Sequence, residues 1–389
     1  MNVPKLRFGE FEDEWQKKQL MNICDMRAGK FVRASEINEN FDEGLYPCFG
    51  GNGLRGFTKS FTHEGKYSLI GRQGALCGNV TLAINKFHAT EHAVVVSPSE
   101  GVSTDWLFYA LGKLNLNQYA TGQAQPGLSI ENLEKVELSI SDSEKEQQKI
   151  ADFLSAVDEK ITALTAQKTA LTQYKQGMMQ RIFAQTLRFK DDNGADYPDW
   201  EKKALGEISL FITNGLALEQ NQEQSGYKVT RIETISDKKI NLNKVGYVET
   251  EQDISDYKLY VGDILLSNIN SISHIGKVVY VDDDYDLYHG MNLLRISIMK
   301  EKHDSKFVFF QLSTPHMKQE FETKANKAVN QASINQTEIK KLILQVPSLA
   351  EQTKVAQFLT ECDDKINAVD AQIQSAQQWK QGLLQQMFV

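Results

Sequence analysis

The sequence contains no long apolar run and no leader-like start. No stretch approaches the ~18 consecutive apolar residues that a membrane-spanning helix needs. Residues 1–15 carry Lys5, Arg7 and several carboxylates, but they lack the apolar core of a secretory signal peptide. The sequence therefore predicts a protein that is neither exported nor embedded in a membrane.

Cysteine is scarce and shows no metal-ligand spacing. The four cysteines, Cys24, Cys48, Cys77 and Cys362, include no CxxC pair. Isolated cysteines of this kind are typical of free thiols in a reducing compartment, whereas zinc sites need paired spacing. We therefore expect a cytoplasmic protein without a disulfide framework and without a metal site.

Motifs of catalysis are also absent. No two of the seven prolines are adjacent, which excludes the Asn/Asp-Pro-Pro-aromatic loop of adenine methyltransferases. No Gly-Lys pair is followed by Ser or Thr, so there is no Walker A loop, and His63-Glu64 lacks the second histidine of a zincin. Lone histidines such as His92 and His289 are typical of packed or solvated side chains. The sequence predicts no catalytic residue, no metal ligand and no cofactor site in this chain.

The charge balance is acidic. The 389 residues carry a formal net charge of −8, and the isoelectric point is about 5.5. This counts against a solitary nucleic-acid binder, because such domains are usually basic. It remains compatible with a binder whose basic side chains lie on one face, or whose partners share the phosphate contacts.

The length predicts two or three domains, and the second half of the chain repeats the first. Four segments recur, the last two in one register without a gap, which indicates a tandem duplication. They are Leu6-Arg7-Phe8 with Leu187-Arg188-Phe189, Trp15 with Trp200, residues 146–154 with 351–359, and residues 174–180 with 379–385.

The intervening segments, residues 20–140 and 206–345, are alike only faintly. Leu69-Ile70 and Gly78-Asn79-Val80 correspond to Leu265-Leu266 and Gly276-Lys277-Val278. Simple drift after duplication is the plainer explanation. Drift alone would erode all segments equally, however, so the contrast favours two similar frames that carry domains with different targets.

Two proline-free segments show heptad periodicity, which predicts long helices with one apolar seam. The first runs from about residue 143 to 183, or ~60 Å at ~1.5 Å per residue. We expect the two helices to pair antiparallel; the alternative is that each packs on its own domain. Phe153 or Leu154, together with Tyr174 and Ile182, fill positions between the main seam residues. The seam residues are Ile150, Val157, Ile161, Leu164, Leu171, Met178, Val355, Cys362, Ile366, Val369, Ile373 and Leu383.

The segments between the helices show short apolar runs broken by glycine, which is typical of a strand-rich α+β domain. We expect strands at 67–70, 75–84, 93–96, 263–266 and 277–281, and short helices near 106–113 and 307–312. The predicted organisation is a first recognition domain at 1–141, a spacer helix at 142–186, a second recognition domain at 187–346 and a second spacer helix at 347–389.

Polar loops within these domains are candidates for contact with DNA bases. The Gly71–Gly74 segment fits neither dinucleotide nor Walker spacing, so tight turns are the favoured interpretation, with Arg72 and Gln73 at the tip. Arginine suits guanine edges, and glutamine or asparagine suits adenine edges. Ordinary turn chemistry explains such residues equally well. The other candidates are Gln123, Gln125, Asn268, Asn270, Ser271, His274, Asn330 and Gln331.

The pattern of repeats and seams resembles the specificity subunit of type I restriction–modification systems over the whole chain. The most specific features are Pro4-Lys5-Leu6-Arg7-Phe8 with Trp15, the Glu-Gln-Xaa-Lys helix starts at 146 and 351, and the Tyr/Trp-Lys-Gln-Gly segments at 174 and 379. The variable domains contain no motif fine enough to transfer base-contact positions from the family.

The resemblance implies a non-catalytic subunit of a bacterial or archaeal cytoplasmic complex. Each recognition domain would read one half of a bipartite, asymmetric site on double-stranded DNA. The helices would set the spacing and dock two methyltransferase subunits, to which restriction (helicase–nuclease) subunits add. S-adenosylmethionine, ATP and Mg²⁺ would then belong to the partners.

Glycine inside a helix costs about 1 kcal/mol relative to alanine, and Gly177 recurs as Gly382. We expect these glycines, with Tyr174 and Trp379, to mark partner docking; helix-end capping is the alternative. A coiled-coil scaffold with two protein-binding domains is the competing class of function. A self-contained nuclease–methyltransferase is a third and weaker hypothesis.

Overall fold

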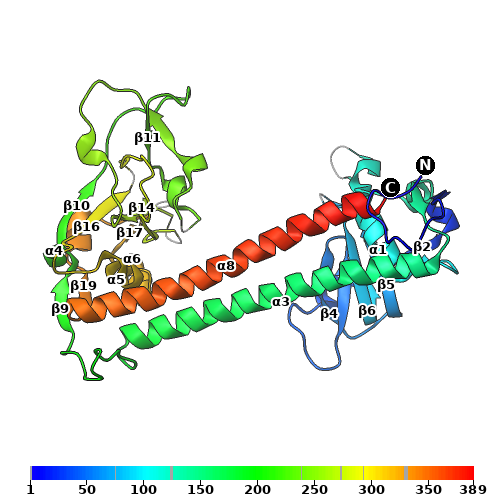
Figure 1. The fold of residues 1–389 in the computed structure, drawn as a ribbon, viewed down its shortest axis with the longest axis horizontal. Coiled ribbons are helices and arrows are strands. Elements are labelled where there is room, and N and C mark those ends of the chain that lie inside the picture. The colour runs from blue at the N-terminus through cyan, green and yellow to red at the C-terminus, as the bar shows by residue number, and fades with distance from the viewer. Residues whose placement is uncertain are drawn as a thin grey trace. The chain divides into compact units, whose positions relative to one another are not determined.

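The computed structural model describes residues 2–74, 76–122, 126–237, 239–271, 274–291, 293–327 and 332–389. The chain forms two compact units. The first comprises Met1–Ala166 with Val369–Val389, and the second comprises Gln167–Ala368. Each unit contains one strand-rich domain and half of each long helix, α3 and α8 (Figure 1). This division differs from the four consecutive segments expected from the sequence.

The two long helices begin at matching signals. Helix α3 spans Glu144–Phe183 and α8 spans Leu349–Met387. The Ser143 and Ser348 hydroxyls accept hydrogen bonds from the backbone N–H groups of Glu146 and Glu351, as N-caps do. The acidic side chains in each first turn also complement the positive end of the helix dipole.

In the first unit, the beginning of α3 packs against the end of α8. Leu154 and Val157 of α3 share one apolar cluster with Leu383 and Met387 of α8. Beside this cluster the Asp158 carboxylate lies 2.6 Å from Lys380 Nζ. The contacts join an early part of one helix to a late part of the other.

In the second unit the two helices exchange these roles. Lys175 of α3 lies 2.6 Å from the Asp363 carboxylate of α8. By the repeat register, Lys175 corresponds to Lys380 and Asp363 to Asp158. The helices therefore pair antiparallel, with one Asp–Lys contact formed in each unit. This confirms the predicted fold class.

The seam differs in detail from the heptad prediction. Leu154, rather than Phe153, is fully buried. Tyr174 is 53% exposed, whereas the Lys175 side chain is only 17% exposed. The lysine stem covers apolar surface while its ammonium group reaches Asp363, which explains how a charged residue takes the seam position. Of the predicted seam residues, Ile150, Val157, Val355, Cys362, Val369, Ile373 and Leu383 are buried, and Ile161, Leu164, Leu171, Met178 and Ile366 are half-buried.

The helix starts also pack on their own domains, so the alternative interpretation holds in part. Ile150 and Leu154 join the core of the first domain. Val355 and Leu359 join the core of the second. All four cysteines are free thiols and buried, as expected. In the described ranges, no helix is both long and apolar enough to cross a membrane.

The first domain is built on a six-stranded sheet in the order β2-β7-β5-β6-β3-β4. All neighbours are antiparallel except β3 and β6. Strand-rich texture was predicted, but the strand expected at 75–84 begins only at Val80, after a loop. The bounds are β2 Cys24–Ala28, β3 Tyr46–Gly50, β4 Gly53–Thr58, β5 His63–Gly71, β6 Val80–Ala89 and β7 Ala93–Pro98, with helices α1 Thr104–Lys113 and α2 Ile130–Glu134.

The second domain contains a four-stranded antiparallel sheet in the order β10-β16-β13-β15. Smaller sheets are formed by β11 with β12 and by β14, β18 and β17. The bounds are β10 Ser209–Asn214, β11 Tyr227–Val229, β12 Gly246–Val248, β13 Ile264–Leu266, β14 Ile269–Asn270, β15 Val278–Tyr280, β16 Leu294–Ile298, β17 Asn326–Lys327 and β18 Ala332–Ser333, with helices α4 Leu205–Ile208, α5 Ser305–Leu312, α6 Pro315–Lys324 and α7 Gln336–Lys340.

The two domains share one frame and differ in what is inserted into it. Strands β2-β7-β5-β6 correspond in order to β10-β16-β13-β15. A two-stranded ribbon precedes each long helix: β1 (Gln16–Gln19) pairs with β8 (Glu137–Ile140), and β9 (Glu201–Ala204) pairs with β19 (Ile343–Val346). The β3–β4 hairpin belongs to the first domain alone, and the β11–β12 ribbon occupies that stretch in the second.

A buried carboxylate at each helix start joins the repeated motifs. The Arg7 guanidinium donates to both oxygens of Glu146, at 2.6 and 2.9 Å, and the Trp15 indole N–H donates to the same carboxylate at 3.3 Å. The Glu146 hydrogen bond raises the pKa of Arg7. We call this the Glu146 clamp.

The second domain contains the same arrangement, which we call the Glu351 clamp. Arg188 donates to Glu351 at 3.1 and 2.7 Å, and the Trp200 indole donates at 3.1 Å. The glutamine that follows each clamp glutamate has a matching role. Gln147 accepts from the Ser103 backbone N–H at 2.8 Å, and Gln352 accepts from that of Asp304 at 3.0 Å. Each clamp therefore fixes a domain and a short helix to a spacer helix.

Replacing Glu146 with Ala should destabilise the chain by about 3–5 kcal/mol, because the largely buried Arg7 guanidinium and the buried Trp15 N–H lose their acceptor. Denaturant unfolding measures the change. The matched control is Lys149→Ala, three residues along the same helix, where an exposed ion pair with Glu10 is lost. It should change the stability little, because exposed ion pairs are screened by solvent. Equal losses in the two variants would contradict a special role for the clamp.

Candidate nucleic-acid interface

A glycine-closed loop connects β5 to β6 in the first domain. The Gly71 N–H donates to Asn79 O at 2.9 Å and the Gly78 N–H donates to Gly71 O at 2.7 Å. Gly78 has φ +90°, and a Cβ there would lie 2.4 Å from the Asn117 backbone nitrogen. The favoured interpretation of these glycines as a tight closure is therefore confirmed, and Arg72 and Gln73 follow it directly.

The second domain closes its corresponding loop by the same two bonds. The Ser267 N–H donates to Lys277 O and the Gly276 N–H donates to Ser267 O, both at 2.8 Å. Gly276 also has a positive φ, at +74°. The correspondence drawn from Gly78-Asn79-Val80 and Gly276-Lys277-Val278 is confirmed. The two loops share a base and differ in sequence and length beyond it.

In each domain the loop lies beside a segment that comes much later in the chain. In the first, the Leu128 N–H donates to Arg72 O at 2.9 Å, and Gln73 forms a β-bridge with Gly127. In the second, the Ile334 N–H donates to Asn268 O at 2.8 Å. The structure therefore brings segments far apart in sequence together at one end of each sheet, at equivalent places.

The candidate side chains differ in how accessible they are. Gln73 is exposed and Arg72 is half-buried, and the Arg72 Nε atom is buried without a hydrogen-bond partner among the described residues. Asn268 is buried, and its amide donates to Ile334 O at 3.2 Å. That amide supports the fold of the loop instead of facing solvent.

The remaining candidates lie around these loops. Ser271 contacts the exposed His274 through its hydroxyl, 2.8 Å from Nδ1, and Asn270 lies in β14. Gln123, Gln125, Asn330 and Gln331 lie outside the described residues. In the described part of the chain, no three His, Cys, Asp or Glu side chains are grouped to hold a metal ion.

Two further turns border the Arg72–Gln73 loop, and sequence reasoning did not single them out. They are the β3–β4 turn at Gly51-Asn52 and the β6–β7 turn that contains His92. The Arg72 N–H donates to His92 O at 3.0 Å. The Gly50-Gly51-Asn52-Gly53 run was the available sequence signal, because such runs mark tight hairpin turns.

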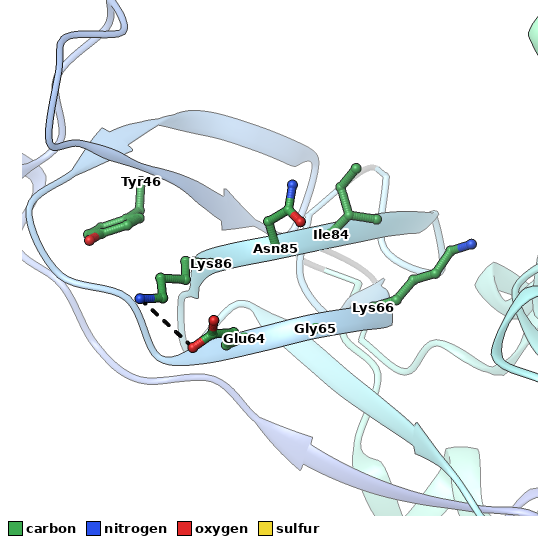
Figure 2. A pocket seen from close by; sticks show the side chains of 7 residues that line it. All are labelled: Tyr46, Glu64, Gly65, Lys66, Ile84, Asn85 and Lys86. Carbon is green, nitrogen blue, oxygen red and sulfur yellow. Dashed lines mark ion pairs between the residues drawn. The ribbon is translucent and has the colours of Figure 1, made fainter.

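A shallow hollow lies toward the other end of the β5–β6 hairpin. Figure 2 shows its lining, in which Glu64 and Lys66 of β5 face Ile84, Asn85 and Lys86 of β6. Lys86 and Glu64 form an exposed ion pair at 3.9 Å, marked by the dashed line. Since Arg72 is seven residues beyond Gly65 along an extended strand, the hollow is roughly 23 Å from Arg72 at ~3.3 Å per residue.

Comparison with known families identifies the chain. The family model described as "Type I restriction modification DNA specificity domain" matches residues 12–173 and 197–376. The chain belongs to the type I restriction–modification DNA specificity family. Members of this family are the non-catalytic, sequence-recognising subunits of restriction–modification complexes, and the two matched ranges correspond to the two repeats.

Named relatives agree with this membership. The chain is 41% identical over 210 residues to a putative MjaX specificity subunit of Methanocaldococcus jannaschii, covering 53% of this chain and 49% of that protein. It is 44% identical over 171 residues to the EcoprrI specificity subunit of Escherichia coli, covering 44% and 41%. The chain therefore spans about half the length, or less, of these curated relatives.

Solved structures share the fold. An S subunit of the type I restriction–modification system from M. genitalium superimposes with a TM-score of 0.67 at 17% identity, covering 100% of this chain and 99% of that one. A chain from a study of complex assembly and conformational transition of the type I R-M system gives a TM-score of 0.54 at 14% identity, covering 95% and 96%. At these identities the likeness concerns the fold alone.

Of the repeated residues on the spacer helices of this specificity-family chain, Gly177, Tyr174 and Trp379 are exposed and Gly382 is half-buried. Gly177 and Gly382 lie inside α3 and α8, so the helix-end cap interpretation is wrong. A Cβ at either glycine would have no described atom within 4 Å. Trp379 is 52% exposed and Tyr174 is 53% exposed. Each ring contacts a phenylalanine of the other helix.

A buried histidine stands at the loop end of the second sheet. The His289 Nε2–H donates to Leu293 O at 2.9 Å, and its Nδ1 has no partner among the described residues. Burial lowers the pKa of His289 to about 4, and the nearby Arg295 contributes in the same direction. The ring is therefore neutral in the folded protein at neutral pH.

This pKa predicts acid lability. The unfolded chain binds a proton at His289 below about pH 6.5, whereas the folded chain binds it only below about pH 4. Stability is therefore complete above pH 6.5 and falls as the pH drops to 4, by ~3 kcal/mol from this group. Denaturant unfolding of the chain and of His289→Gln at pH 7 and pH 4 measures it. An equal loss of stability in both proteins would contradict the assignment of acid lability to His289. His316→Gln on α6 is the control, and it should lose stability as the unmodified chain does.

Proposed function

We propose that this chain is the DNA sequence-recognition subunit of a type I restriction–modification complex, in which each domain reads one half of a bipartite, asymmetric site. The observation that supports this is the shared frame with unlike loops. Both domains present a loop closed by the same two backbone hydrogen bonds, yet the residues beyond that closure differ. A common position with different side chains suits two domains that read different base pairs.

The reading loops are proposed to include Arg72 and Gln73 in the first domain, and Asn270, Ser271 and His274 in the second. Exposed amides and guanidinium groups distinguish base edges in the major groove. The other proposed contacts are Gln123, Gln125, Asn330 and Gln331. Asn268 enters the proposal as a residue that shapes its loop, because its amide is already bonded to Ile334.

The spacer helices are proposed to set the distance between half-sites and to dock two methyltransferase subunits in the cytoplasm. The docking faces are Tyr174 with Gly177 and Trp379 with Gly382. One aromatic ring and one glycine, three residues apart, lie on the same helix face. Two equivalent copies of this face suit two copies of one partner. Restriction subunits are proposed to join this complex. S-adenosylmethionine, ATP and Mg²⁺ are proposed to bind the partner subunits and not this chain.

Exchange of one domain tests the division of labour. Residues 22–135 can be replaced by those of another family member while the Glu146 clamp and strands β1 and β8 remain. We expect one half of the methylated motif to change and the other to stay the same, as measured by methylome sequencing with the cognate methyltransferase. Simultaneous change in both halves would argue against independent domains. Loss of all DNA selectivity would favour a protein scaffold instead.

Bulky substitutions at the helical glycines test the docking proposal. Gly177→Arg and Gly382→Arg should leave the fold intact or stabilise it by up to about 1 kcal/mol, because the space is open and glycine is a poor helix former. Each should nevertheless lose one methyltransferase subunit from the complex, as light scattering of the co-purified assembly measures. Ala163→Arg, an exposed position on α3, is the control. Full assembly in both glycine variants would refute docking at these faces.

The half-chain tests the equivalence of the two helices. A fragment ending at Lys190 retains Asp158 and Lys175, which correspond to Asp363 and Lys380 of the second repeat. Two copies can therefore form the same Asp–Lys contact twice in an antiparallel pair. We expect a dimer that, with methyltransferase, modifies an interrupted palindrome built from the first half-site. A stable monomer would show that the seams are not interchangeable, and Asp158→Lys should weaken the dimer.

A further inference from the structure

The β3–β4 turn rests directly on the Arg72–Gln73 loop. A Cβ at Gly71 would lie 1.9 Å from Gly51 O, so glycine is needed there for the two backbones to meet. A Cβ at Gly51 would in turn lie 3.2 Å from both Gln73 O and His92 O. Three turns, from β3–β4, β5–β6 and β6–β7, therefore meet within van der Waals distance of Gly51.

Backbone hydrogen bonds hold this junction in place. The Arg72 N–H donates to His92 O at 3.0 Å, and the Thr90 N–H donates to Phe49 O at 2.9 Å. The first bond ties the reading loop to the β6–β7 turn, and the second ties that turn to β3. The backbones of the three turns are thus held in place beside one another, and a fixed scaffold is a requirement for reading adjacent base pairs.

Two side chains of the junction carry base-reading chemistry and are accessible. Asn52 is exposed, and its side chain makes no hydrogen bond within the described ranges. The His92 side chain is 39% exposed, and its Nε2 lies 3.3 Å from a Glu91 carboxylate oxygen. A neutral imidazole has one acceptor nitrogen, which suits a base that offers an exocyclic amine.

The β3–β4 hairpin is also what the second domain lacks. The four-stranded frame is common to both domains, whereas this hairpin occurs only in the first. If the two domains read different half-sites, residues on an element that only one of them has are well suited to cause the difference. Asn52 stands at the turn of that element, beside the shared loop.

We propose that Asn52 and His92 contact bases of the same half-site as Arg72 and Gln73. This inference rests on the proposed function of the chain and names specificity-determining residues for it. Asparagine donates and accepts on the adenine edge, so Asn52 is assigned to an adenine, and His92 to a base that offers an amine. Arg55, exposed on β4 with its stem 3.6 Å from a Cβ placed at Gly50, is suited to a phosphate instead.

The test uses the full chain co-expressed with its cognate methyltransferase. Methylome sequencing defines the motif, and the purified complex is then titrated against duplexes in which each base pair is changed singly. Asn52→Ala and His92→Ala should each lose discrimination at one or two positions of the first half-site, by about five- to 150-fold, with the second half-site unchanged. Asn52→Asp keeps the side-chain shape but removes the amide donor, so it should also lose the adenine preference.

Two controls separate base reading from other effects. Arg55→Ala should weaken binding to all duplexes alike and reduce its salt dependence, as loss of a phosphate contact does. Lys86→Ala, at the hollow shown in Figure 2, should leave the motif unchanged. Thermal unfolding of each variant shows whether a change in motif is accompanied by loss of folding.

The outcomes distinguish this inference from the function on which it rests. If Arg72→Ala with Gln73→Ala relaxes the first half-site while Asn52→Ala and His92→Ala keep full discrimination, the proposed function stands and this inference fails. It fails also if either variant alters the second half-site or weakens all duplexes uniformly. If the unmodified complex shows no sequence preference at all, the proposed function itself fails.

Discussion

The buried carboxylate at the start of each spacer helix is the interaction on which the rest of the structure depends. Glu146 and Glu351 each accept from one arginine and one tryptophan that lie far away in the sequence. An ionised group without solvent must be fully paired, so removing any partner leaves an uncompensated charge or donor. This requirement explains why the repeated residues Arg7, Trp15 and Glu146 recur together in the second half. They form one contact, and that contact joins a domain to the helix that carries it.

Because the clamp fixes one end of each domain, the loops at the other end can vary in sequence and length. The four-stranded frame and the two hydrogen bonds that close each reading loop are the same in both halves. The elements inserted between β2 and β5, or between β10 and β13, are different. Backbone groups supply the common geometry and therefore place little demand on side-chain identity. Side chains at the tips are therefore free to differ between the two domains.

The sequence predicts correctly those features that follow from repeats and periodicity. It does not predict features that depend on contacts between residues far apart in the chain. The duplication, the two helices and the loop correspondence of Gly78 with Gly276 followed from pattern. The seam position at Lys175 did not, because a heptad count treats lysine as polar and cannot see Asp363 across the helix pair. Asn268 was assigned to base contact, yet its amide bonds to Ile334, a partner set by the strand pairing of β14 with β18. Asn52 and His92 were not chosen, because only the sheet order brings their turns beside Arg72.

The exchange of partners between the two helices makes each helix depend on the other. Each helix contributes its aspartate to one unit and its lysine to the other, so both Asp–Lys contacts require both helices. Each compact unit therefore contains part of each helix, and neither repeat buries its apolar seam alone. A change at a loop tip leaves these contacts untouched, whereas a change in helix register breaks a contact in both units at once. Alterations of the spacer must therefore be accommodated by both repeats together.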